Sequence, residues 1–349
     1  MRERGIGSED GVLEQIRRVF PGQLHKRSGG LRSAAGSRFL SLGIGDDAAL
    51  ISGTPGYEMV LTCDWFLEGT HFWRDKHPAD AIGWKCLARA VSDIAAMGAV
   101  PRCFLLSLAL PRELTSSWLH DFLGGLRRAA TRFGCSLAGG DTTERREVLI
   151  NVTVVGEVRR GREVRRSGAR PGDLIYISGR LGEAELGLGL GLRLLRQRKW
   201  GLNMREPRLR RHLYPEPRLE LGRWLSEKRL ASAMMDLSDG LSSDLRRLCE
   251  ASTVGAVIRS DFLPTIRATK LDRKHGVDPI LLALHGGDDY ELLFTVPNNK
   301  GKRLPRSVGG VAITRIGEIT RALDVLVADG DGRSRVLNPR GWDPFRKSK

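Results

Sequence analysis

The sequence predicts a mixed α/β fold arranged in two domains, and three observations support that prediction. The chain has 349 residues, more than one hydrophobic core usually organises, and 41% of them are hydrophobic. Short runs rich in Val, Ile and Leu alternate with stretches of helical periodicity. A charged stretch, Arg159 to Arg166, is followed by Ser167, Gly168, Pro171 and Gly172, which is typical of a connection between domains.

The expected strands and helices follow from apolar spacing and from the turn residues around it. Strand-like runs are found at Met59 to Thr62, Cys103 to Leu108, Val148 to Val155 and Leu174 to Ile177. A helix is expected from Ala79 to Met97, with apolar residues along one stripe and Gly98 as its C-terminal cap. A second helix is expected to begin near Thr115 and to stop at Gly134.

The charged stretch divides the chain into expected domains at residues 1–165 and 166–349. Two further segments, His25 to Ser37 and Gln197 to Arg211, are expected to be mobile loops because neither offers an apolar face. The run Gly187 to Gly191 alternates Gly and Leu but lacks the strand and turn of a dinucleotide fingerprint. We interpret this run as a site of close helix packing.

Composition excludes several classes of protein. No stretch approaches the roughly 20 apolar residues of a membrane helix, and no targeting peptide is visible, so we expect a cytoplasmic protein without membrane contact. Five scattered cysteines, never spaced as C-x-x-C, argue against a disulfide framework or a zinc site. The net charge of +16 could attract either nucleic acid or anionic small ligands, but the sequence has no RNA-binding aromatic motif and no zinc finger. Nucleic acid is therefore disfavoured as the main partner.

The chemical signal is a set of aspartates in acidic turns that are expected to follow apolar strands. The turns are Gly45-Asp46-Asp47, Thr62-Cys63-Asp64, Gly139-Gly140-Asp141, Asp236-Leu237-Ser238-Asp239-Gly240 and Gly286-Gly287-Asp288-Asp289, and Asp93 lies near a helix end. A single Asp beside Gly is more often a turn or cap residue, and Asp239 could cap a helix that begins at Leu241. Several such turns in a strongly basic chain are harder to explain in this way, because clustered carboxylates repel unless cations lie among them.

Oxygen donors without clustered Cys or His favour magnesium over zinc, and magnesium commonly accompanies phosphate. The P-loop pattern is absent, since Gly301-Lys302 is followed by Arg303, and no H-R-D or D-F-G motif marks a protein kinase. The residues alone therefore indicate metal-assisted phosphate chemistry on another fold.

In order along the chain, the motifs resemble the thiamine-monophosphate kinase family, which shares a superfamily with aminoimidazole ribonucleotide synthetase and selenophosphate synthetase. The matching segments are Gly43 to Ala49, Cys63-Asp64 with Glu68 to Phe72, Ser92 to Ala99, Ala138 to Thr143, Arg166 to Asp173, Asp236 to Leu241 and Gly287 to Leu292. The resemblance implies the two-domain ATP-binding fold of the aminoimidazole ribonucleotide synthetase type. It also implies a homodimer in which the N-terminal sheets pair, and an active site between the domains.

The same resemblance assigns roles to single residues. It implies magnesium ligands at Asp47, Thr62, Cys63 through its backbone carbonyl, Asp64, Asp93, Asp141, Asp236 and Asp239. It implies nucleotide contacts at Gly140, Asp141, Arg166 and Ser238, and substrate contacts at His71, Asp288 and Trp342. The chain departs from the family pattern where Cys63 replaces Thr or Ser and where Asp288 replaces Glu.

The implied reaction is in-line transfer of a phosphoryl group from ATP to thiamine monophosphate, which gives thiamine diphosphate. The acceptor phosphate, with a second pKa of about 6, is largely a dianion at neutral pH, so no acid or base residue is required. Several Mg²⁺ ions would offset its repulsion from ATP. Two alternatives stay open: an ATP-dependent enzyme that activates an amide or carbonyl oxygen, and a nucleic-acid-binding protein that keeps a degenerate kinase fold.

Overall fold

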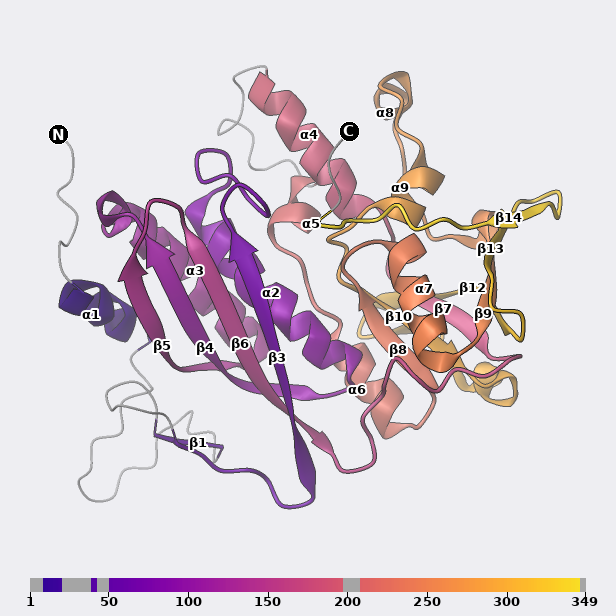
Figure 1. Cartoon of the computed structure of the whole chain (residues 1–349), viewed down its shortest axis with the longest axis horizontal. Helices are drawn as coiled ribbons and strands as arrows, with labels where there is room; N and C mark the ends of the chain where they lie inside the picture. The colour runs from indigo at the N-terminus through magenta and orange to yellow at the C-terminus, as the bar shows by residue number, and fades with distance from the viewer. Residues whose placement is uncertain (1–8, 21–38, 43–49, 197–207, 346–349) are drawn as a thin grey trace. The chain divides into compact units, whose positions relative to one another are not determined.

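The computed structural model describes residues 9–20, 39–42, 50–196 and 208–345 (Figure 1). Within this part the chain forms two compact units. The first contains residues up to 94 together with 100–160, and the second contains residues 95–99 together with 161 onward. No helix among the described residues is long and apolar enough to cross a membrane.

The first unit is built on a four-stranded sheet with the order β3-β6-β4-β5. Strands β4 and β5 run parallel, and the other neighbours are antiparallel. Its elements are α1 (Glu9–Val19), β1 (Leu40–Leu42), β2 (Leu50–Ile51), β3 (Tyr57–Leu67), α2 (Ala79–Ala96), β4 (Val100–Leu110), η2 (Arg112–Leu114), α3 (Ser117–Phe133), β5 (Ser136–Glu144) and β6 (Leu149–Arg159).

The expected strands at 59–62 and 103–108 are confirmed as parts of β3 and β4, and the one expected at 148–155 is confirmed as part of β6 except for Val148, which precedes it. The prediction of a turn is wrong for two of the acidic segments, which are parts of strands in the structure. Cys63-Asp64 lies inside β3, where Asp64 pairs with Val152, and Gly139 to Asp141 lies inside β5, where Gly140 pairs with Leu106. Ladder pairing with neighbouring strands therefore keeps both segments extended despite their glycine and aspartate content.

Helices α2 and α3 lie against one face of this sheet (Figure 1). The stripe expected on α2 is confirmed, because Ile82, Cys86, Ala90 and Ile94 are almost completely buried. Helix α3 ends at Gly134, whose φ of 65° places it in the left-handed region that glycine adopts without strain. Because these helices cover this face of the sheet, the side chains of β3 that point to it point towards α2.

The opposite face of the sheet is partly open. Side chains alternate along a strand, and Met59, Leu61 and Trp65 of β3 are 53%, 66% and 56% exposed. Leu105 of β4 adds to this open face at 40% exposure. Phe39, just before β1, covers another part of the sheet by packing on Cys103, Ala138 and Val155.

The second unit contains a larger sheet with the order β14-β13-β9-β12-β7-β10-β8, to which β11 is joined through β12. Only β13 and β9 run parallel among its paired strands. Its elements are β7 (Leu174–Ser178), α4 (Glu183–Arg196), α5 (Leu209–Leu213), α6 (Leu219–Glu227), β8 (Ala233–Leu237), α7 (Leu241–Ser252), β9 (Gly255–Arg259), η3 (Ser260–Phe262), α8 (Lys270–Lys274), α9 (Pro279–His285), β10 (Glu291–Val296), η4 (Asn298–Arg303), β11 (Ser307–Val308), β12 (Val311–Thr320), β13 (Val325–Ala328) and β14 (Ser334–Val336).

Helices cover both faces of this second sheet. Leu241, Leu245 and Leu248 of α7 pack with α9 and with one set of strand side chains. Leu221 and Leu225 of α6 pack with the alternate set, which comes from β7, β8 and β10. Strands β8 and β10 are buried along their whole length, which explains their nearly continuous apolar sequence.

The loop expected at Gln197 to Arg211 is partly wrong. Residues 197–207 and the segment His25 to Ser37 lie outside the described residues, but Leu209 begins helix α5. This helix has an apolar face after all, since Leu209 and Leu213 are each 1% exposed. Close helix packing, expected for the run Gly187 to Gly191, is found at Gly187, where a Cβ would lie 2.7 Å from the carbonyl oxygen of Arg208, but not at Gly189, where a Cβ would have no neighbour within 4 Å.

Candidate active site

In the second unit, two acidic turns are joined by their backbones. The N–H of Asp288 donates to the carbonyl of Ser238 at 2.8 Å, and the N–H of Tyr290 donates to the carbonyl of Leu237 at 2.9 Å. Glycine is needed at 287 for this approach, because a Cβ there would lie 2.8 Å from the Ser238 oxygen. The turns after β8 and before β10 therefore form one structural element.

A third segment joins these turns near the C-terminus. The N–H of Trp342 donates to the carbonyl of Asp239 at 2.8 Å, and the Trp342 side chain is 47% exposed. The structure thus brings together four residues proposed from the sequence: Ser238, Asp239, Asp288 and Trp342. Asp236 lies on β8 opposite Leu292 and is only 3% exposed.

The charge of Asp239 is balanced within the second unit. Nη1 of Arg247 donates to Oδ2 of Asp239 at 2.5 Å and to Oδ1 of Asp244 at 2.8 Å. Burial, together with the charge of Asp239, raises the pKa of Asp244 to about 7. Arg247 therefore holds two adjacent carboxyl groups that would otherwise repel each other.

Asp239 does not act as a helix cap. Helix α7 begins after Gly240, and no side chain accepts a bond at that capping position. The fully buried Asp244 takes over part of this task, since its Oδ2 accepts bonds from the N–H groups of Asp239 at 3.1 Å and of Gly240 at 3.0 Å. The Asp239 carboxylate is therefore not used by the turn itself.

Arg166 lies elsewhere in the second unit. Its backbone carbonyl accepts a hydrogen bond from the Ser252 hydroxyl at 3.0 Å, and Ser252 is the last residue of α7. Ser238 precedes the first turn of the same helix. At a rise of about 1.5 Å per residue, the backbones of Arg166 and Ser238 lie near opposite ends of a helix about 17 Å long. The structure does not bring these two nucleotide-contact candidates together at the backbone.

In the first unit, Thr62 and Asp93 form the closest pair among the proposed residues. The Thr62 hydroxyl donates to Oδ2 of Asp93 at 2.5 Å, which links β3 to α2. Asp64 lies two residues beyond Thr62 and points to the same face of the strand. Three oxygen-bearing side chains thus belong to the α2 side of the sheet.

Cys63 points to the opposite, open face. Its Sγ lies 3.2 Å from Nδ2 of Asn151 and 3.5 Å from Oγ1 of Thr153, both on β6. The thiol is therefore directed away from Thr62 and Asp64.

The remaining candidates of the first unit lie apart from that pair. Gly140 and Asp141 are on β5, which is separated from β3 by two strands, or about 14 Å across the sheet. The Asp141 carboxylate accepts the N–H of Thr142 at 2.9 Å. Nδ1 of His71 accepts the N–H of Leu67 at 3.0 Å, and its ring lies 5.7 Å from that of Phe66.

The donor chemistry fits magnesium, because the proposed side-chain ligands offer oxygen and no nitrogen or sulfur. Across residues 9–20, 39–42, 50–196 and 208–345, however, no three His, Cys, Asp or Glu side chains are close enough to hold one ion. Asp47 lies outside the described residues. The described residues therefore do not form a complete metal site.

Comparison with known proteins identifies the family. The model for the AIR synthase related protein N-terminal domain matches residues 45–158, and the model for its C-terminal domain matches residues 170–327. Thiamine-monophosphate kinase of Escherichia coli K12 is 38% identical over 313 residues, which is 88% of this chain and 92% of that protein. The enzyme of Aquifex aeolicus is 36% identical, over 86% of this chain and 92% of that protein. This chain belongs to the thiamine-monophosphate kinase family.

Solved structures agree with this assignment. Thiamine-monophosphate kinase from Stenotrophomonas maltophilia K279a superposes with a TM-score of 0.75 at 35% identity, covering 94% of this chain and 98% of that one. AaThiL complexed with AMPPCP and TMP gives a TM-score of 0.72 at 32% identity, covering 98% and 97%. The hydrogenase maturation protein HypE in complex with ATP is 21% identical, with a TM-score of 0.72, and shares the fold. The aminoimidazole ribonucleotide synthetase type of fold expected from the sequence is confirmed.

Three residues of this thiamine-monophosphate kinase family member received no role from its sequence. Asp244 and Arg247 adjust the charge around Asp239, and Tyr290 donates its hydroxyl to Oδ1 of Asp288 at 2.7 Å. A signal for the first two is present, since Asp244 and Arg247 share one helix face three residues apart, next to Asp239. Tyr290 carries no comparable signal, because an aromatic residue before an apolar strand is ordinarily part of a core.

Proposed function

We propose that this chain transfers the γ-phosphoryl group of ATP to thiamine monophosphate and so produces thiamine diphosphate. The observation that carries the proposal is similarity over nearly the full length to AaThiL, whose solved complex contains AMPPCP and TMP. The same reaction is named by relatives 33–38% identical to the chain. Acidic segments in both units supply oxygen donors of the kind that such a reaction needs.

The proposed magnesium ligands include residues of each unit. Residues assigned to them are Asp47, Thr62, Cys63 by its carbonyl, Asp64, Asp93, Asp141, Asp236 and Asp239. When bound, Mg²⁺ ions would supply positive charge that offsets the repulsion between two polyanionic substrates. The pairing of Thr62 with Asp93 and the exposed position of Asp141 support this use of oxygen donors.

The remaining candidates orient the substrates. Gly140, Asp141, Arg166 and Ser238 are proposed to contact ATP, and His71, Asp288 and Trp342 to contact thiamine monophosphate. The acceptor phosphate is largely dianionic at neutral pH, so none of these residues has to remove a proton. Transfer is direct, with no covalent enzyme intermediate, and the protein contributes positioning in line with the γ-phosphate.

A coupled assay of ATP consumption tests this function. Thiamine monophosphate, free thiamine and aminoimidazole precursors are offered side by side in the presence of Mg²⁺. We expect turnover with thiamine monophosphate and little with thiamine, because thiamine lacks the dianionic nucleophile. Comparable turnover of thiamine, or preference for an aminoimidazole precursor, would refute the proposed acceptor. Retention on DNA or RNA that depends on salt, without ATP turnover, would instead favour a binding protein.

We also propose that the chain forms a homodimer through the open face of its first sheet. Its exposed Met59, Leu61, Trp65 and Leu105 support the proposal, because contiguous apolar surface commonly marks an interface. The sequence resemblance implied pairing of the N-terminal sheets, and β4 and β6 are the central strands of that sheet. Both lie inside the sheet with neighbours on either side, so they could contribute their faces but not their edges.

A further inference from the structure

The carboxylate of Asp288 is contacted on both of its oxygens. The Tyr290 hydroxyl donates to Oδ1 at 2.7 Å, and Nδ1 of His212 on α5 lies 3.8 Å from Oδ2. Tyr290 is 2% exposed and His212 is also buried, whereas the Asp288 side chain is 29% exposed. A partly accessible carboxylate is therefore supported from behind by two buried polar groups.

The backbone of this turn is unusual. Asp288 has a φ of 67° and Tyr290 a φ of 50°, so two residues with side chains occupy the left-handed region within three positions. For an aromatic residue this conformation is strained, and it persists only where surrounding bonds determine it. Strain of this kind is concentrated at functional sites, and here its effect is to direct the Tyr290 hydroxyl back to Asp288.

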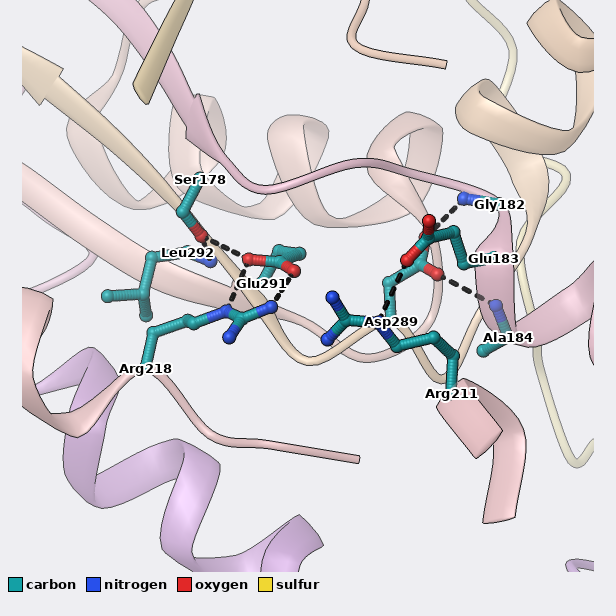
Figure 2. A network of polar contacts seen from close by, with 9 residues as sticks. All are labelled: Ser178, Gly182, Glu183, Ala184, Arg211, Arg218, Asp289, Glu291 and Leu292. Carbon is teal, nitrogen blue, oxygen red and sulfur yellow. Dashed lines mark hydrogen bonds and ion pairs between the residues drawn. The ribbon is translucent and has the colours of Figure 1, made fainter. Parts of the chain in front are cut away.

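Asp289 and Glu291, on either side of Tyr290, anchor the turn to the rest of the second unit (Figure 2). Oδ2 of Asp289 accepts the N–H of Gly182 at 2.6 Å, and Oδ1 accepts the N–H of Ala184 at 3.2 Å, at the start of α4. The Glu291 carboxylate is bound by the Arg218 guanidinium and accepts the Ser178 hydroxyl at 2.5 Å. Asp289 and Glu291 point into the fold.

We propose that Tyr290 is a positioning residue that fixes the Asp288 carboxylate for the acceptor and so sets acceptor affinity. The inference rests on the proposed function, in which Asp288 contacts thiamine monophosphate. Tyr290 acts only through Asp288: its ring fills a buried site, and its hydroxyl selects one orientation of the neighbouring carboxylate. A ligand that binds a preoriented group does not have to order it, and this lowers the cost of binding.

The test is Tyr290→Phe, which removes the hydroxyl and keeps the ring. We expect the KM for thiamine monophosphate to rise on the order of tenfold, the size of effect a lost hydrogen bond to a charged group can have. The kcat, the KM for ATP and the Mg²⁺ concentration for half-maximal rate should stay within about twofold. Thermal unfolding reports whether the variant is folded.

Tyr176→Phe is the matched control. Tyr176 is also nearly buried, at 8% exposure, and its ring lies 5.6 Å from Phe294 in the same sheet, remote from the Asp288 turn in sequence and register. This variant should leave every kinetic constant near wild type. A similar rise in KM for Tyr176→Phe would show that loss of any buried tyrosine hydroxyl is enough, and would overturn the inference.

A double-mutant cycle with Asp288→Ala separates positioning from direct contact. If Tyr290 acts through Asp288, adding Tyr290→Phe to Asp288→Ala changes KM less than about twofold. Additive effects, a fall in kcat, or a shifted Mg²⁺ requirement would overturn the positioning role. Failure of the wild-type protein to use thiamine monophosphate would refute the proposed function itself, whereas an active wild type with an unaffected Tyr290→Phe variant refutes only this inference.

Discussion

The Asp239 carboxylate is 25% exposed and forms an ion pair with Arg247 at 2.5 Å. We predict that Asp239→Asn lowers turnover on the order of 100-fold or more, because it removes charge where cations must gather. Extra Mg²⁺ should restore only part of the loss. The measurement is kcat at several Mg²⁺ concentrations with both substrates saturating.

The control for this variant is Asp261→Asn. Asp261 forms an ion pair with Arg259 at 2.6 Å on the surface of the same unit, but it belongs to no acidic turn proposed to bind metal. Loss of that pair should leave turnover unchanged. Near wild-type turnover of Asp239→Asn at sub-millimolar Mg²⁺ would remove Asp239 from the set of metal ligands.

Asp288 is expected to respond differently although it too lies in an acidic turn. The variant Asp288→Glu restores the longer carboxylate of the family pattern without changing charge. We predict that its KM for thiamine monophosphate falls or stays unchanged, while kcat and Mg²⁺ dependence are little altered. Steady-state kinetics with each substrate varied in turn provides the check. If the variant mainly changed the Mg²⁺ requirement, the roles of the two turns would be wrongly assigned.

At the scale of elements, helix α4 starts on a buried carboxyl group. Burial, with smaller contributions from Glu291 and Glu183, raises the pKa of Asp289 far above its ordinary value, to about 8. Because the folded state binds this proton more tightly than the unfolded state, the stabilising contribution is complete below about pH 4. It is lost as pH rises through about 8.

This leads to a prediction for Asp289→Asn, which removes the titration and retains an oxygen acceptor. The free energy of unfolding of the wild type minus that of the variant should fall as pH rises from 5 to 8. Urea denaturation of both proteins at several pH values measures it, and the titration of other groups cancels in the difference. A difference that is constant or increases with pH would show that Asp289 is already ionised in the folded protein.

The sequence predicted elements well where apolar periodicity is strong and poorly where it is not. Helix α2 was expected from Ala79 to Met97 and ends at Ala96. Strand β5 was missed because Gly139 and Gly140 weaken its pattern, and its extended form depends on pairing with β4. Helix α5 was missed because its two leucines are interrupted by charged residues.

The candidate site residues also divide into those that a sequence pattern indicates and those that only the folded structure brings into view. Ser238, Asp239 and Asp288 could be selected from short motifs, since each motif lies in one continuous segment. The hydroxyl of Tyr290 and the shared hydrogen bonds of Arg247 depend on backbone angles and on distances through space. No spacing in the sequence reports an aromatic residue at a φ of 50°.

At the scale of the whole molecule, the charge and the apolar surface have separate uses. A net charge of +16 suits a protein proposed to bind two polyanions, and it raises their local concentration without selecting between them. The open face of the first sheet is different, because four large apolar side chains there are 40–66% exposed. Exposed apolar surface of this kind favours association with another protein surface.

We predict that the chain is a dimer, with twice the mass of one 38.6 kDa chain by light scattering at micromolar concentration. Leu61→Asp places a charge at the most exposed of these four apolar side chains, on strand β3, and should shift the mass towards that of one chain. Leu271→Asp changes an equally large side chain, 58% exposed on α8 of the other unit, and should leave the dimer intact. A wild-type monomer would refute the dimer, and a Leu61→Asp dimer would place its interface on another surface.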